Sequence, residues 1–171
     1  MNVPGRGYPG QREHFRGANH NTSGTVSLPA PRSVSYFEDE DKKRLRAELV
    51  DSRAAELAKS FAAPAPVNNR HSKPLKTTQM RRFYDELKAI ERKIFQGGGS
   101  QEQAENFAKN LALLKMFKAK AVYAEKREAA PREFTQFIFD HVSSIADIKD
   151  FRAFLKVFES VVAFHRFFAG D

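Results

Sequence analysis

The sequence predicts an all-α protein: a compact helical bundle of about four core helices plus one N-terminal helix, preceded by a disordered tail. Apolar residues recur at helical spacing over most of residues 75–171, and no segment shows the alternation typical of a strand. Breaks containing glycine or proline separate these stretches by short connections, so neighbouring helices should pack mostly antiparallel. The 16 Phe residues, most of them in the second half of the chain, indicate an aromatic core.

The first 74 residues divide into three parts of different composition. Residues 1–33 are basic and rich in Gly, Pro, Asn and Ser, with little apolar surface to bury, which predicts a disordered tail. Residues 34–61 are charged and helix-prone, but their apolar positions are sparse and their charges cancel. We therefore expect a helix that is peripheral or docks on a partner. Residues 62–74 contain prolines and form a linker that cannot continue the helix.

Residues 75–171 are expected to form the bundle domain. Its first helix begins at Thr77 or Thr78, either of which can act as an N-cap, and it ends at the glycines of residues 97–99. A second helix covers about residues 101–127. Pro131 suits the first turn of a third helix, and Asp147 caps a fourth. The residues expected to face the core are Met80, Phe83, Tyr84, Leu87, Ile90, Ile94, Phe107, Leu111, Leu114, Phe117, Ala121, Val122, Phe134, Phe137, Ile138, Val142, Phe151, Phe154, Leu155, Phe158, Val162, His165 and Phe168.

The fourth bundle helix carries more aromatic residues than a single buried stripe needs. Phe164 and Phe167 fall off its main apolar face. The helix is therefore either buried on two sides within the bundle or partly covered by another subunit.

Positive charge is concentrated in one part of the chain. Residues 73–127 carry 13 Lys or Arg and 6 Asp or Glu, a net charge of +7, whereas the whole chain carries +8. A basic face on a folded element is the usual footprint of a polyanion partner, although many basic helices are only solvated surfaces. Charge alone therefore leaves nucleic-acid binding and a solvated face as alternatives.

The sequence contains no recognisable catalytic or metal-binding combination. The absence of Cys excludes disulfides, thiolate zinc sites and a cysteine nucleophile. The five His lack metal-ligand spacing, and His165 falls on an apolar face where a core histidine is the usual finding. We therefore expect no enzyme, no catalytic residue, no metal and no cofactor. Because the sequence shows neither a membrane-spanning run nor a signal peptide, we expect a cytoplasmic protein without membrane association.

Basic side chains on the first two bundle helices are the remaining candidates for a functional site. Lys109, Lys120 and Arg127 are 11 and 7 residues apart, which places them within about 20° of one another around a helix. Lys118 is different, because in a straight helix it would project from the apolar face. Three arrangements are open for it: its stem snorkels past the core edge, the helix bends near residues 116–117, or its ammonium emerges in a groove between helices and meets a ligand.

Three blocks of the sequence, in order, resemble a known family. Residues 114–128, LKMFKAKAVYAEKRE, contain the pattern Lys-x-Lys-x-x-Tyr with a downstream Arg, and residues 77–84, TTQMRRFY, are similar to the first core helix of the same family. Residues 150–167, which include FESVVAFHRF, are similar to its C-terminal signature, with Ser160 and Phe164 where Ala and Tyr are usual. The family is the small helical subunit of type III-A CRISPR effector complexes, the Csm complex.

The resemblance implies a non-catalytic RNA-binding subunit. Such subunits stack in several copies along the groove where guide RNA pairs with target RNA, so the implied partners are guide (CRISPR) RNA, target RNA, the backbone and large subunits, and neighbouring copies of the chain. Because any guide sequence must be accepted, contacts to the RNA backbone are expected rather than contacts to base edges. Family position and charge together give the candidate RNA-binding residues Arg81, Arg82, Lys109, Lys118, Lys120 and Arg127.

Two other classes of function stay open on the sequence. A helical protein–protein adaptor would present the same basic face to acidic partner surfaces without binding RNA directly. A DNA-binding helical domain would use the last two helices as a helix-turn-helix, but the final helix is too aromatic to be a good major-groove reader.

Overall fold

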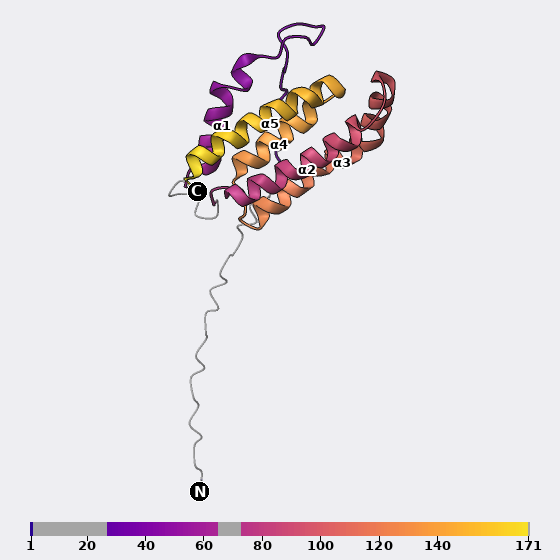
Figure 1. The fold of residues 1–171 in the computed structure, drawn as a ribbon. Helices are drawn as coiled ribbons and strands as arrows, with labels where there is room; N and C mark the ends of the chain where they lie inside the picture. Colours follow the sequence, from indigo (N-terminus) through magenta and orange to yellow (C-terminus); the bar gives the residue numbers. More distant parts are fainter. Residues whose placement is uncertain (2–26, 65–72, 171) are drawn as a thin grey trace.

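The computed structural model describes Met1 and residues 27–64 and 73–170, and in these ranges the regular secondary structure is helical apart from one isolated bridge. The predicted all-α class is confirmed. The elements, shown in Figure 1, are the 3₁₀ helix η1 (Ala47–Leu49) and the helices α1 (Ser52–Ala62), α2 (Thr77–Phe95), α3 (Ser100–Lys126), α4 (Arg132–Ser144) and α5 (Ile148–Ala169).

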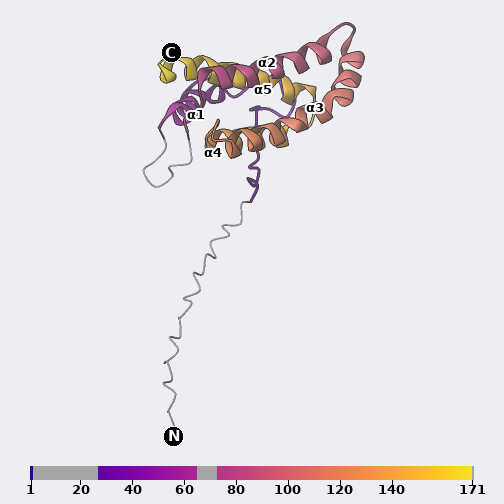
Figure 2. The ribbon, with the colours of Figure 1, turned by 90° about the horizontal axis from the view of Figure 1, so that it is seen from below.

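Helix α5 is central to the bundle, because it packs against α1, α2 and α3, while α4 packs against α3 and α1. Figure 2 shows that α3 curves as it passes from the α2–α3 hairpin to α4. Large rings fill the space between α4 and α5: the Phe137 ring centroid lies 5.6 Å from that of Phe158 and 6.1 Å from that of Phe154. The core is therefore aromatic, as the phenylalanine content predicts.

The core residues expected from helical spacing are mostly buried, but Phe168 is exposed in the last turn of α5. Phe164 and Phe167, which fall off the main apolar face, are half-buried and 79% exposed. Ala153, Val157 and Val161 are also buried, on a second side of the same helix. Helix α5 is thus buried on two sides within the bundle, which accounts for its apolar content except at Phe167 and Phe168.

The helix ends agree with the sequence in part. Asp147 caps α5, since its Oδ1 accepts hydrogen bonds from the backbone N–H groups of Lys149 at 2.8 Å and Asp150 at 2.9 Å. Helix α2 begins at Thr77 with Lys76 in the N-cap position and no side-chain cap, so the expected threonine cap is wrong. The α2–α3 turn needs glycine, because Gly97 and Gly98 have φ of 83° and 46°.

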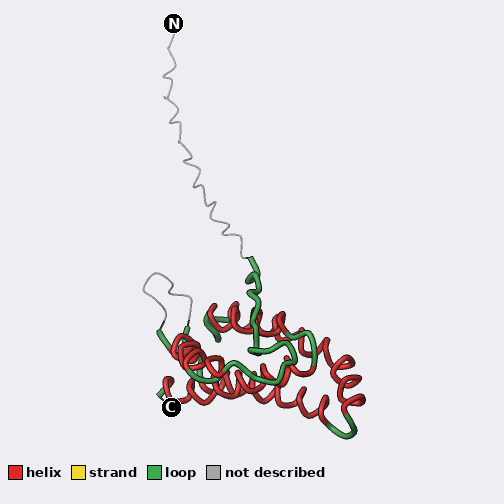
Figure 3. Tube along the Cα trace, turned by 90° about the horizontal axis from the view of Figure 1, so that it is seen from above, coloured by secondary structure: helices red, strands yellow, loops and turns green. Residues whose placement is uncertain are grey.

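The N-terminal part differs most from its expected organisation. Residues 2–26 of the expected tail lie outside the described residues, but residues 27–37 form an extended strap across α4. Figure 3 shows this strap as a loop that crosses the helices. The Arg32 backbone N–H donates to Asp140 Oδ1 at 2.8 Å, and Gln136 Nε2 donates to the carbonyl of Ala30 at 2.9 Å. The boundary expected at residue 33 is therefore wrong, because the tail does not extend that far.

The expected helix over residues 34–61 is an α-helix only from Ser52 onward, after the short 3₁₀ helix η1. Before it, residues 38–45 turn back in a loop closed by a bridge between Phe37 and Leu45. The Asp39 carboxylate accepts the backbone N–H groups of Lys43 and Arg44, at 3.2 and 2.8 Å, so it stabilises a turn rather than a helix start. Lys42 in this turn has a φ of 57°.

Helix α1 belongs to the core and is not peripheral. Ala54, Ala58 and Phe61 are fully buried, and the two small alanines allow close packing against α5. Residues 65–72 of the expected linker lie outside the described residues, but its end is anchored, because the Leu75 backbone N–H donates to the carbonyl of Phe61 at 2.8 Å. In the described ranges, no helix is both long and apolar enough to cross a membrane.

Candidate nucleic-acid interface

Four of the six candidate residues share one surface, formed by neighbouring sides of α2 and α3. Lys109, Lys120 and Arg127 are exposed along one side of α3, as their spacing predicts. An ion pair between Lys120 and Glu86 joins this side of α3 to α2. Arg82 is exposed one helical turn before Glu86 and therefore lies on the same edge of α2. We call the surface of Arg82, Lys109, Lys120 and Arg127 the outer face.

Arg127 lies at the C-terminal end of α3, where it follows the last helical residue. Its guanidinium carbon is 5.5 Å from the centroid of the Tyr123 ring, and its Nη1 is 3.4 Å from the Tyr123 hydroxyl. Both contacts lie within one helical turn. The position favours a cation, because helix carbonyls concentrate partial negative charge at a C-terminus.

Arg81 points to the opposite edge of α2 from Arg82, because adjacent helical residues differ by about 100° around the axis. Its Nε lies 3.9 Å from Asp85 Oδ2, and its side chain is 77% exposed. With Arg166 it lines a groove of about 620 Å³ between α2 and α5. Arg81 is therefore next to the outer face and not part of it.

Lys118 lies in the seam between α3 and α4. It is half-buried, and its Nζ is 5.4 Å from the centroid of the Phe139 ring on α4. Residues two apart differ by about 200° around a helix, so Lys118 and Lys120 face nearly opposite directions. The ammonium of Lys118 thus lies between α3 and α4, over the Phe139 ring in a cation–π contact.

Lys115 occupies the same seam. Its Nζ donates to the carbonyl of Val142 on α4 at 2.8 Å. Burial lowers the pKa of Lys115, and the nearby charge of Lys118 lowers it further. The two lysines therefore hold like charges close together at one helix–helix contact.

Replacing Lys118 separates a packing role from an RNA role. Lys118→Met keeps the stem over Phe139, so we expect its free energy of unfolding to stay within about 0.5 kcal/mol of the wild type, whereas Lys118→Ala loses stem packing and about 1 kcal/mol. Because Lys118 faces away from the outer face, both variants should bind RNA within about twofold of the wild type. Denaturant titration and RNA titration of each variant measure the two effects. A tenfold loss of RNA affinity in Lys118→Met would place the seam on the RNA.

The two described helical histidines are core residues. His165 is fully buried, and its Nε2 lies 2.9 Å from the carbonyl of Leu75, which confirms the expected core histidine. His141 is also buried, and its Nδ1 lies 3.0 Å from the hydroxyl of Tyr36 on the strap. In residues 27–64 and 73–170, no group of three or more His, Cys, Asp and Glu side chains is placed to hold a metal ion.

The family model Csm2 Type III-A matches residues 44–171, which include every described helix. The chain belongs to this family. As a Csm2 family member it is the structural small subunit of a type III-A CRISPR effector complex, which contains other Csm subunits and RNA. No curated protein and no solved structure matches the chain significantly.

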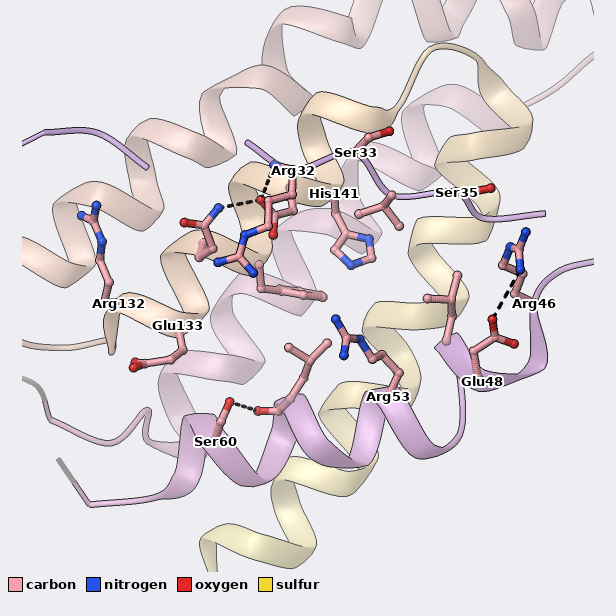
Figure 4. A pocket seen from close by; sticks show the side chains of 16 residues that line it. Arg32, Ser33, Ser35, Arg46, Glu48, Arg53, Ser60, Arg132, Glu133 and His141 are labelled. Carbon is pink, nitrogen blue, oxygen red and sulfur yellow. Dashed lines mark hydrogen bonds and ion pairs between the residues drawn. The ribbon is translucent and has the colours of Figure 1, made fainter. Parts of the chain in front are cut away.

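The Csm2 match leaves out residues 27–43, of which residues 32–35 form one wall of a pocket of about 530 Å³ shown in Figure 4. The pocket lies between the strap, α1 and α4, and Arg53 points into it toward the ring of His141. Burial lowers the pKa of His141 to about 3, and the charge of Arg53 adds to this effect. The charged residues that line the pocket are Arg32, Arg46, Arg53, Arg132, Glu48, Glu133 and Asp140, so its charges nearly balance. Sequence reasoning missed this pocket, since its wall depends on contacts between positions more than 100 residues apart.

Proposed function

We propose that the chain is a non-catalytic RNA-binding subunit that lines the groove in which guide RNA pairs with target RNA. The outer face is the single observation that carries this proposal: four exposed cations from two helices that pack on each other. Family membership supports it, because a Csm2 subunit belongs to a complex that holds RNA. In this role no catalytic residue, metal or cofactor is required.

The geometry favours contacts to the RNA backbone. Lys and Arg on rigid helices can neutralise phosphates at fixed spacing, and this interaction is independent of base sequence. Lys120 must exchange its partner Glu86 for a phosphate, which costs little because both side chains are nearly half exposed. A subunit with this surface therefore accepts any guide sequence.

We assign the contacts to protein partners to other surfaces. Phe167 is 79% exposed at the end of α5, which carries none of the outer-face cations, and an exposed phenylalanine is a common anchor at protein interfaces. The same observation favours the competing function, a helical adaptor that meets acidic protein surfaces without binding RNA. Within the first proposal, Phe167 serves contacts to the backbone and large subunits or to a neighbouring copy.

The proposed function is tested by titrating the purified chain with two unrelated single-stranded RNAs and one duplex RNA at several salt concentrations. Four phosphate contacts give an expected slope of about −3 for log affinity against log salt with single strands. The two sequences should bind within about threefold of each other. A flat salt response, or a hundredfold preference for one sequence, would contradict backbone binding. Absence of RNA binding would favour the adaptor.

A further inference from the structure

Exposed apolar side chains gather on the side of α3 that carries the outer face. Leu113, Met116 and Tyr123 are 37%, 53% and 63% exposed, and they are among the few large hydrophobic residues that face solvent in the described part of the chain. Positions 113, 116, 120, 123 and 127 follow one another at spacings of three or four residues, which places them on one side of the helix. Helix α3 therefore has apolar residues both on its core side and on its solvent side.

Tyr123 presents its ring to solvent although Arg127 already covers part of it. The guanidinium carbon of Arg127 lies 5.5 Å from the ring centroid, yet Tyr123 remains 63% exposed. Because the core of α3 is complete without it, this exposed ring has no role in the packing described above. Single exposed hydrophobics are ordinary, but three on one stripe mark a contact surface.

The chemistry between these apolar residues identifies the partner. Lys120 lies between Met116 and Tyr123 along the stripe, and Arg127 follows one turn later. Met, Tyr and Arg are also common in protein–protein interfaces, but Lys120 lies in the middle of the stripe, and the buried core of such an interface is depleted in lysine. Aromatic and cationic side chains interleaved along one surface are instead the usual means of holding single-stranded nucleic acid.

We propose that Tyr123, flanked by Lys120 and Arg127, forms a stacking site for an unpaired nucleobase of the RNA bound to the outer face. The proposal rests on the proposed function and adds a second kind of contact to it. Bases inside an A-form duplex cover one another, so a helix side chain can reach a base face only where the base is unstacked. The site takes any base, because every base offers a π-face.

The test uses the full chain and a short single-stranded RNA that carries one 2-aminopurine flanked by uridines. Stacking on Tyr123 should quench the fluorescence of 2-aminopurine when the wild type binds. Tyr123→Leu should remove this quenching and weaken single-strand binding about tenfold, while its affinity for duplex RNA stays within about twofold. Tyr123→Phe keeps the ring and should retain both quenching and affinity. Phe167→Leu is the matched control, since it removes an even more exposed ring from another helix.

Several outcomes would overturn the stacking site. Equal losses of single-strand and duplex affinity in Tyr123→Leu would show a general effect on the surface, and unchanged quenching would show that the base lies elsewhere. Altered self-association of Tyr123→Leu in sedimentation, with unchanged RNA binding, would assign the stripe to a protein contact. If the wild type binds RNA in a salt-dependent way but does not quench the fluorescence, the stacking site is rejected and the proposed function is retained. Absence of RNA binding by the wild type would reject the proposed function as well.

Discussion

Replacing Lys42 with Met is expected to lower the free energy of unfolding by about 2–3 kcal/mol. Lys42 joins the loop of residues 38–45 to the start of α5: its Nζ lies 2.7 Å from Asp147 Oδ2 and 2.8 Å from Asp150 Oδ1. The side chain of Asp150 is only 7% exposed, so loss of the cation leaves a buried carboxylate without its countercharge. This expected loss of stability is smaller than the loss for a fully buried ion pair, because the Lys42 side chain is 29% exposed.

The neighbouring lysine gives a matched control for this measurement. Lys43 also forms an ion pair, with Asp41 at 2.8 Å, but both side chains are more than 70% exposed. Lys43→Met should therefore change the free energy of unfolding by less than about 0.5 kcal/mol in the same denaturant titration. Equal effects of the two substitutions would show that the loop of residues 38–45 contributes nothing to stability through Asp150.

The second large effect is a loss of stability in mild acid caused by His141. Its ring packs 4.5 Å from the Phe137 centroid and 5.3 Å from the Phe154 centroid, and burial lowers its pKa from 6.5 to about 3. Between these values the unfolded chain binds a proton that the folded chain does not. The free energy of unfolding therefore falls as pH is lowered from about 6.5, by up to about 1.4 kcal/mol per pH unit.

The contribution of His141 is measured by difference. From pH 7 to pH 5 the wild type should lose about 2 kcal/mol more than His141→Gln, which cannot take up a proton in this range. His141→Gln also loses ring packing, so the change with pH is compared and not the stability at one pH. Chemical denaturation at both pH values gives the four free energies required. Parallel losses in the two proteins would mean that His141 does not remain neutral when folded.

Much of the bundle could be predicted from the sequence, because local patterns determine it. The apolar spacing of residues 77–95 and 100–126, the glycines between them and the cap at Asp147 each act over a few residues. The strap could not be predicted in this way. Its anchors, Asp140, His141 and Ser144, lie more than 100 residues away, and hydrogen bonds to them leave no periodic signal. The helix expected over residues 34–61 also fails near its start, because Asp39 caps a turn through the backbone N–H of Arg44.

In the candidate site, too, features of a single helix could be predicted from the sequence, and features that depend on contacts between helices could not. Spacing alone placed Lys109, Lys120 and Arg127 on one stripe, because that geometry is a property of a single helix. The orientation of Lys118 required the position of α4, and the pairing of Lys120 with Glu86 required the packing of α2 on α3. The exposure of Met116 and Tyr123 could be known only from the packing of the helices. The sequence alone does not show whether an apolar residue near a core stripe faces the core or the solvent.

The most direct test of the outer face compares two triple variants that remove equal charge. One carries Arg82→Gln, Lys120→Gln and Arg127→Gln, and the other carries Lys59→Gln, Lys156→Gln and Arg166→Gln, which are exposed cations on α1 and α5. For single-stranded RNA, we expect the outer-face variant to lose at least about tenfold in affinity and about 2 units of salt slope, while the control keeps the wild-type slope. Equal losses in both variants would contradict a localised RNA surface, because net charge alone would then account for binding.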